Sequence, residues 1–141
     1  MAVVDVMDET FLAAVPAVVV AQVGGPEAWA ALWPDLRLTV LADRGVQGVR
    51  WRVGGAWTGS MEVWLEPVLD GTVLHYFLRL DPTTAEGAAG LAGRAATREA
   101  LRRQRAAKAV AFALKDRLEA GRPPGVAPAH RGPGADADGR L

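Results

Sequence analysis

An Asp70-Gly71 pair separates two long runs of alternating apolar and polar residues, and no other feature of the chain constrains its fold as strongly. The runs extend from Trp57 to Val68 and from Thr72 to Asp81. Alternation with a period of two is typical of strands, and Asp-Gly favours a tight two-residue hairpin turn. The sequence therefore predicts two long antiparallel strands that are direct neighbours in a sheet.

This turn also predicts which side chains share a face of the hairpin, because successive residues of a strand point to opposite faces. The face that we expect to be buried is apolar and aromatic: Met61, Val63, Leu65, Leu74, Tyr76, Leu78 and Leu80. The face that we expect to be wet pairs side chains across the two strands: Glu66 with His75, Trp64 with Phe77, and Glu62 with Arg79.

The preceding hairpin has two possible registers. Gly54 and Gly55 allow a loop of two or three residues, and a difference of one residue moves every side chain of the strand to the other face. We favour the three-residue loop, residues 54–56, which divides the strand as follows: Val49, Trp51 and Val53 on the apolar face, Arg50 and Arg52 on the charged face. The two-residue loop would place the three apolar residues beside a polar group that could then line a pocket: Glu62, His75 and Arg79.

The rest of the chain completes an α+β order. Three further strands are predicted: Val3 to Leu12, Leu36 to Ala42, and Val46 to Val53. Two short helices, each bounded by Gly or Pro, are predicted after the first strand: Ala17 to Val23 and Glu27 to Trp33. Small residues from Thr83 to Gly93 predict a loop or a weak helical turn, and Arg94 to Ala120 predicts a long helix that ends at Gly121.

The long helix combines an apolar stripe with many basic residues. The stripe is predicted to contain Leu101, Ala107, Val110, Ala111, Leu114 and Leu118. The basic residues are Arg94, Arg98, Arg102, Arg103, Arg105, Lys108, Lys115 and Arg117. They form either a solvated outer face or a surface for RNA, another protein or anionic lipid.

The composition excludes several classes of site. The 141 residues include no Cys and only two His, so we expect no disulfide, thiol nucleophile, metal site or cofactor. Sixteen Lys and Arg balance sixteen Asp and Glu, which argues against a DNA-binding protein. The longest apolar stretch, Phe11 to Val23, is shorter than the roughly 20 residues of a membrane span.

The two ends of the chain differ in composition from its centre. Asp5, Asp8 and Glu9 occupy positions where a secretory leader would be basic and then apolar, so we expect a cytoplasmic protein. Residues 121–141 are rich in Pro and Gly and are expected to be disordered. One domain of residues 1–120 followed by a disordered tail is the organisation that we predict.

Several blocks of sequence resemble a known superfamily. They are PEAWAALWPDLR at 26–37, GVRWRV at 48–53, GSMEVWLEPVLDGTVLHYFLRLDP at 59–82, and the long helix. In this order they resemble the START-related helix-grip superfamily, which includes birch-pollen-type allergens, lipid-transfer START domains and polyketide cyclase/dehydrase-like proteins. The Trp-Pro and DGT-x-L-x-Y motifs are similar to the actinobacterial polyketide-cyclase-like branch. A full helix-grip sheet has six or seven strands, whereas this chain predicts five.

The resemblance implies a curved antiparallel sheet that wraps the long C-terminal helix and encloses an apolar ligand of the lipid, polyketide or quinone type. The residues that could line such a cavity are Trp33, Trp51, Met61, Val63, Leu65, Tyr76, Leu78, Val110 and Leu114. The same residues could equally fill an ordinary core. Tyr76 is the most informative of them, because a buried phenol needs a hydrogen-bond partner and could orient a ligand carbonyl.

A polyketide aromatase/cyclase-like enzyme is the alternative to a binder or carrier. Its acid–base candidates are His75, Tyr76, Glu62 and Arg79. Cross-strand pairing explains His75, Glu62 and Arg79 without any chemistry. Trp64 and Phe77 on the wet face predict a homodimer through that face.

Overall fold

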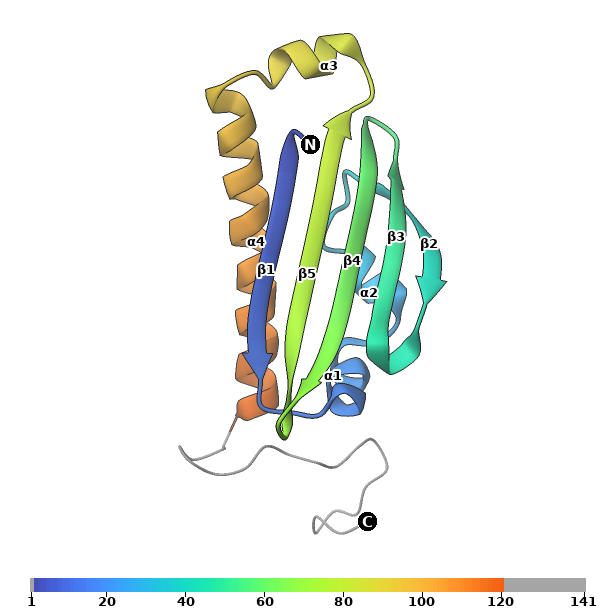
Figure 1. Ribbon diagram of the computed structural model, residues 1–141, viewed down its shortest axis with the longest axis vertical. Coiled ribbons are helices and arrows are strands. Elements are labelled where there is room, and N and C mark those ends of the chain that lie inside the picture. Colours follow the sequence, from blue (N-terminus) through green and yellow to red (C-terminus); the bar gives the residue numbers. More distant parts are fainter. Residues whose placement is uncertain (1, 121–141) are drawn as a thin grey trace.

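The computed structural model describes residues 2–120, and it contains one antiparallel sheet with the strand order β1-β5-β4-β3-β2 (Figure 1). The strands are β1 (Val4–Leu12), β2 (Arg37–Asp43), β3 (Gly48–Gly54), β4 (Trp57–Val68) and β5 (Gly71–Pro82). The helices are α1 (Pro16–Val23), α2 (Pro26–Ala30), the short 3-10 helix η1 (Gly45–Gln47), α3 (Ala85–Gly90) and α4 (Arg94–Glu119). The predicted α+β order is confirmed, and the tail 121–141 lies outside the described residues.

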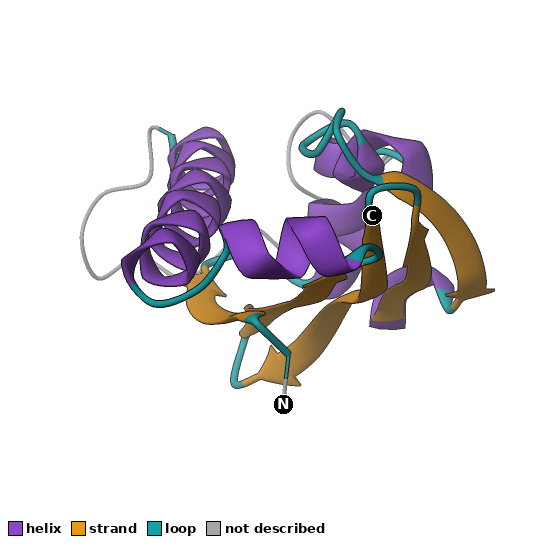
Figure 2. Ribbon diagram, turned by 90° about the horizontal axis from the view of Figure 1, so that it is seen from above, coloured by secondary structure: helices purple, strands orange, loops and turns teal. Residues whose placement is uncertain are grey.

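The helices lie on one side of the curved sheet. Figure 2 shows α4 along one edge of the sheet and the α1–α2 segment on the same side, toward the other edge. Val19 of α1, Trp29 of α2 and Leu114 of α4 belong to one buried cluster with side chains of the sheet. The face of the sheet that carries this cluster is called the inner face below, and the opposite face is called the outer face.

The inner face confirms the predicted division of side chains. All seven apolar residues assigned to it on β4 and β5 are buried, and so are Val49, Trp51 and Val53 of β3. The three-residue loop therefore gives the correct faces. The register differs, because Val53 pairs with Gly59 and not with Trp57 as that loop would require.

The β4–β5 turn is displaced by one residue from its predicted position. Val68 pairs with Gly71, so the turn residues are Leu69 and Asp70, and Leu69 adopts the left-handed φ of 55°. Gly71 is the first residue of β5, and the position requires glycine because a Cβ there would lie 2.6 Å from the carbonyl oxygen of Leu12 on β1. The faces are unchanged, but the predicted cross-strand pairs are wrong: Trp64 lies opposite His75, Glu62 opposite Phe77, and Ser60 opposite Arg79.

Helix α4 packs against β1 with a stripe that differs from the predicted one at its N-terminal end. Ala107, Ala111 and Leu114 are buried and Val110 is half-buried, but Leu101 is 44% exposed. Arg103 takes its place in the stripe because it lies one helical turn before Ala107. No helix in residues 2–120 has the length and apolar character of a membrane span.

Side chains of α4 also cover the free edge of the sheet along β1. Three donors reach backbone carbonyls that face away from β5: Gln104 to Met7 at 3.4 Å, Lys108 to Glu9 at 3.1 Å, and Lys115 to Phe11 at 2.8 Å. Edge strands expose such unpaired backbone groups to other chains. In this fold, side chains of α4 occupy three of these carbonyls of β1.

Candidate functional site

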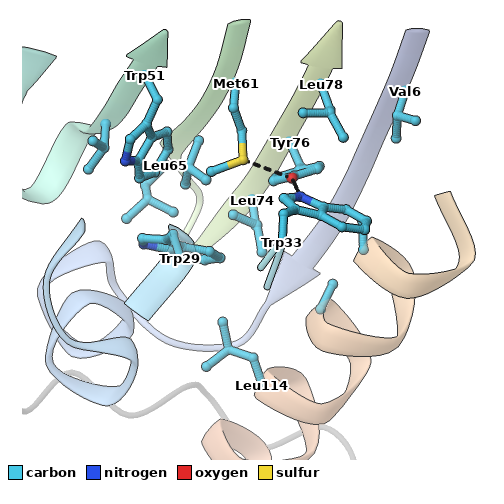
Figure 3. Packing of buried hydrophobic residues seen from close by; sticks show 14 of the residues in the cluster. Val6, Trp29, Trp33, Trp51, Met61, Leu65, Leu74, Tyr76, Leu78 and Leu114 are labelled. Atoms are coloured by element: carbon cyan, nitrogen blue, oxygen red, sulfur yellow. Dashed lines mark hydrogen bonds between the residues drawn. The ribbon is translucent and has the colours of Figure 1, made fainter. Parts of the chain in front are cut away.

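Tyr76 lies at the centre of the inner face, where both hydrogen-bonding functions of its phenol are used (Figure 3). The indole Nε1 of Trp33 donates to the Tyr76 hydroxyl, and this hydroxyl lies 3.0 Å from Met61 Sδ, to which it donates. Tyr76 and Trp33 are 4% and 3% exposed. The phenol that sequence analysis singled out therefore already has its partners within the protein.

Burial raises the pKa of the Tyr76 phenol above its ordinary value, although the Trp33 hydrogen bond and the Arg103 charge act in the opposite direction. The unfolded chain therefore releases this proton first, and stability is lost as the pH rises above the ordinary tyrosine pKa of about 10. We expect each further pH unit to cost about 1.4 kcal/mol until the folded phenol ionises.

The alkaline loss of stability is measurable without a label, because Tyr76 is the one tyrosine of the chain. Tyrosinate absorbance should rise together with the loss of circular dichroism at high pH, and urea titrations should show the slope between about pH 10 and 12. Tyr76→Phe should flatten this part of the slope. Ionisation near the ordinary tyrosine pKa in the still folded protein would contradict the burial.

Arg103 is a further polar group of the interior, and its side chain is 0% exposed. Its guanidinium carbon lies 5.0 Å from the ring centre of Trp33 and 5.2 Å from that of Trp57. It forms ion pairs with Asp35 at 2.6 Å and Glu99 at 2.7 Å. The arginine thereby ties the segment that follows α2 to helix α4.

The two carboxylates respond to this arginine in the same way. Partial burial opposes their ionisation, but the hydrogen bonds and charge of Arg103 outweigh it and lower the pKa of Asp35. The pKa of Glu99 is lowered against the same opposition by hydrogen bonds and charges of Arg102 and Arg103. Arg103 was predicted to be one of the basic surface residues of the helix, although its position one turn before Ala107 was a signal that it is buried.

An apolar hollow of about 150 Å³ opens beside this interior, where the α1–α2 connection approaches β3 and β4. Trp29, Val63 and Leu65 form part of its wall, and Gly24 to Pro26 form part of its rim. Gly24 has a φ of 103°, a conformation that side chains rarely adopt. The hollow therefore lies between the sheet and a segment of two short helices joined by glycines.

The nine residues predicted to line a cavity lie on or toward the inner face. Eight are buried in one cluster, and Val110 is half-buried. Of the nine, Val63 and Leu65 also line the open hollow. Trp29 and Val20 line the hollow as well but were absent from the predicted set.

The four acid–base candidates are not brought together. Tyr76 points to the inner face, whereas the neighbouring His75 points to the outer face with Glu62 and Arg79. Arg79 pairs with Asp5 at 3.7 Å, and Glu62 lies 3.8 Å from Arg50. The predicted contact between Glu62 and Arg79 is therefore replaced by contacts to the flanking strands.

His75 is enclosed on the outer face. Its Nδ1 lies 2.9 Å from a Glu9 carboxylate oxygen, and its Nε2 lies 2.8 Å from one of Glu66. Trp64 stacks on the ring with a centroid distance of 4.2 Å, and Phe77 lies parallel to it at 6.3 Å. The Glu66 contact was predicted, but it is diagonal and not directly cross-strand. Both ring nitrogens are occupied by this chain, which favours the structural interpretation of the cluster.

Half of the eight basic residues of α4 are also engaged within the chain. Besides Arg103, these are Arg102 with Glu99 at 2.6 Å, Lys108 with Asp8 at 3.2 Å, and Lys115 with Glu119 at 2.8 Å. Their positions are explained by contacts to β1 and within α4. Because these residues are engaged within the chain, the structure supports an RNA-binding or protein-binding role of α4 less than the sequence does.

Three solved structures are similar to this chain. The solution structure of the Aha1 dimer from Colwellia psychrerythraea is similar with a TM-score of 0.58 and 16% identity, covering 85% of this chain and 99% of that one. The crystal structure of TTHA0849 from Thermus thermophilus gives a TM-score of 0.50 and 16% identity, with 84% and 99% covered. Ara h 8.0201 gives a TM-score of 0.42 and 14% identity, with 78% and 96% covered.

No protein-family model matches the chain, and no curated protein matches it. The polyketide-cyclase-like branch indicated by the sequence motifs therefore stays a prediction. The Aha1 and TTHA0849 likenesses extend over nearly the whole length of those proteins. Together with the five-stranded sheet and the long C-terminal helix, they show that the chain has an α+β helix-grip fold.

Proposed function

We propose that the chain binds a small apolar molecule between the inner face of its sheet and the helices that cover it. The observation that carries the proposal is the open apolar hollow walled by Trp29, Val63 and Leu65, next to the aromatic interior around Tyr76. Ligand sites are concave, mostly apolar and furnished with a few polar groups that fix orientation. The hollow provides the concave apolar surface, and the Tyr76 phenol provides the polar group.

The size of the hollow limits the ligand. Its volume of about 150 Å³ is below the roughly 300–1,000 Å³ of sites for drug-sized molecules. One ring of a quinone or polyketide, or a short acyl chain, fits without rearrangement. A longer molecule requires the α1–α2 segment to move outward, and Gly24 and Gly25 supply the backbone freedom for such a movement.

Tyr76 gives the ligand a polar anchor. Its hydroxyl donates to the thioether of Met61, which is a weak acceptor. A ligand carbonyl that reached the phenol would be the stronger acceptor and could replace the sulfur without disturbing the Trp33 donor. The proposal therefore favours molecules with an apolar body and a carbonyl. A cyclase-like enzyme is the alternative, and its chemistry in the interior would rest on Tyr76 among the four candidates.

Native mass spectrometry of freshly purified protein, followed by denaturing extraction, tests the proposal. We expect a stoichiometric apolar adduct, or a raised melting temperature with short-chain quinones, fatty acids or aromatic polyketides. Val20→Trp should fill the hollow and abolish binding, since Val20 lines it from α1. Gln22→Trp is the matched control on the same helix, since Gln22 is exposed and does not line the hollow. Empty protein that none of these probes stabilises would overturn the proposal.

The homodimer through the Trp64 and Phe77 face stays a prediction that the same spectra test. Met7 and Trp64 are 63% and 38% exposed on that face, and the similar Aha1 structure is a dimer. Against this, Trp64 already covers His75 within the monomer. We expect a dimer that Trp64→Ser dissociates. A monomer at high micromolar concentration would contradict the prediction.

A further inference from the structure

The outer face contains a second hollow, of about 190 Å³, on the opposite side of the sheet from the apolar interior. Its lining residues come from three adjacent strands: Arg50, Ser60, Met61, Glu62, Phe77 and Arg79. The register explains how it forms. Ser60 on β4 lies between Arg79 on β5 and Arg52 on β3, and its small side chain leaves space between two long ones.

The charges around this hollow are unevenly matched. Arg79 lies 3.7 Å from Asp5, and Arg50 lies 3.8 Å from Glu62, distances too long for hydrogen bonds. Their side chains are 63% and 50% exposed, so guanidinium donors remain available to a ligand. Among residues 2–120, Arg52 forms no ion pair.

Ser60 lies between Arg79 and Arg52, at a position where an acidic side chain would neutralise both arginines. Elsewhere on this face, His75 has Glu9 and Glu66 as neighbours. Between Arg79 and Arg52 there is only a hydroxyl. The acidic residue of the lining, Glu62, is already flanked by Arg50 and by Arg44 at 3.5 Å, which offset its charge.

We infer that this hollow binds a phosphate group carried by a small molecule. Arginine guanidinium groups present planar pairs of donors that match phosphate oxygens, and a serine hydroxyl adds a further donor. Two arginines of the lining, Arg50 and Arg79, together with the Ser60 hydroxyl suit a dianion better than a monoanion, and Arg52 lies opposite Ser60 on β3 outside the lining residues. Phe77 forms an apolar wall beside them, so a phosphomonoester of an aromatic or aliphatic group fits better than inorganic phosphate.

The inference does not depend on the apolar ligand, because the two hollows are on opposite faces of the sheet and Ser60 and Val63 point away from each other. Phosphate on a soluble molecule and phosphate on a lipid headgroup offer the same chemistry to these arginines. A soluble ester and vesicles that contain phosphatidic acid therefore have to be compared directly.

The test is a titration of the full chain with phenyl phosphate, followed by calorimetry and by amide NMR shifts, at constant ionic strength and at a protein concentration where sedimentation shows a monomer. We expect saturable binding with shifts centred on β3, β4 and β5, weaker binding of inorganic phosphate, and still weaker binding of benzoate. Stronger binding to phosphatidic acid vesicles than to phosphatidylcholine vesicles would identify the lipid source, and equal binding to both would identify the soluble one.

Ser60→Glu separates binding from folding. The new carboxylate would lie between Arg79 and Arg52, so the melting temperature should hold or rise while affinity for phenyl phosphate falls at least about tenfold. Leu69→Glu adds the same charge at the far end of the β4–β5 hairpin, where Leu69 is 95% exposed, and should bind as the parent does. Arg79→Gln should also weaken binding. The inference is overturned if Ser60→Glu binds like Leu69→Glu, or if phenyl phosphate and benzoate bind equally.

Discussion

Replacing Trp33 with alanine is expected to lower the free energy of unfolding by about 4 kcal/mol, the largest effect of any single substitution considered for this chain. Trp33 is 3% exposed, and its ring lies against the Arg103 guanidinium. The substitution removes this packing and leaves the Tyr76 hydroxyl without its donor. Urea denaturation followed by circular dichroism measures the loss.

The cavity left by Trp33→Ala gives the experiment a second readout. Empty apolar cavities bind small apolar molecules, so indole or benzene should raise the melting temperature of the variant by more than that of the parent. Trp64→Ala is the matched control, because Trp64 is 38% exposed on the outer face and its loss should cost only about 1 kcal/mol. Equal costs for the two tryptophans would show that Trp33 does not anchor the interior.

Arg103→Met should destabilise the protein by about 2–3 kcal/mol at neutral pH. Removing one member of a buried ion pair costs roughly 3–5 kcal/mol when the remaining charge stays buried. Here Asp35 is 49% exposed and can be solvated, whereas Glu99 is only 19% exposed, so the cost falls below that range. Methionine fills most of the vacated volume, which limits the loss to the polar contacts.

The pH dependence of Arg103→Met identifies the cause of the loss. The folded pKa values of Asp35 and Glu99 are lowered, so the stability that they contribute is present above the ordinary carboxylate pKa of about 4 and is lost as the pH falls through the folded values. The difference between parent and variant should therefore shrink below about pH 4. Urea titrations at pH 7 and pH 3 test this. Arg102→Met controls for the exposed pair, since Arg102 also binds Glu99 but is 58% exposed, and it should cost less than about 1 kcal/mol.

Alternation and turn residues were sufficient to predict the strands and the faces of β3, β4 and β5. Period-two patterning assigned Trp51, Met61 and Tyr76 to one face, and all three are buried there. Register was less predictable, because moving both strands by one residue preserves the faces while changing every cross-strand partner. The shift at Gly71 depends on how closely β1 approaches, which becomes visible only when distant parts of the chain pack together.

The candidate site was predicted in its apolar part and not in its polar part. The period of two in the sequence indicates which hydrophobic residues share a buried face, so the apolar residues around Tyr76 could be predicted. The sequence does not distinguish the buried Arg103 from a surface arginine. Its carboxylate partners are Asp35 and Glu99, and no sequence pattern indicates that they contact it. The outer hollow depends likewise on the register that places Ser60 between Arg79 and Arg52.

The contacts of α4 with β1 restrict how copies of this sheet could extend one another. Gln104, Lys108 and Lys115 occupy the carbonyls of β1, while β2 forms the other edge and carries the exposed Val40 and Leu41 beside a bulge. Growth by strand addition needs two free edges on every copy. With β1 closed, two copies that met along β2 would form a doubled sheet sealed by a helix at both ends. Polymerisation by this route would stop at the pair and could not continue into a fibre.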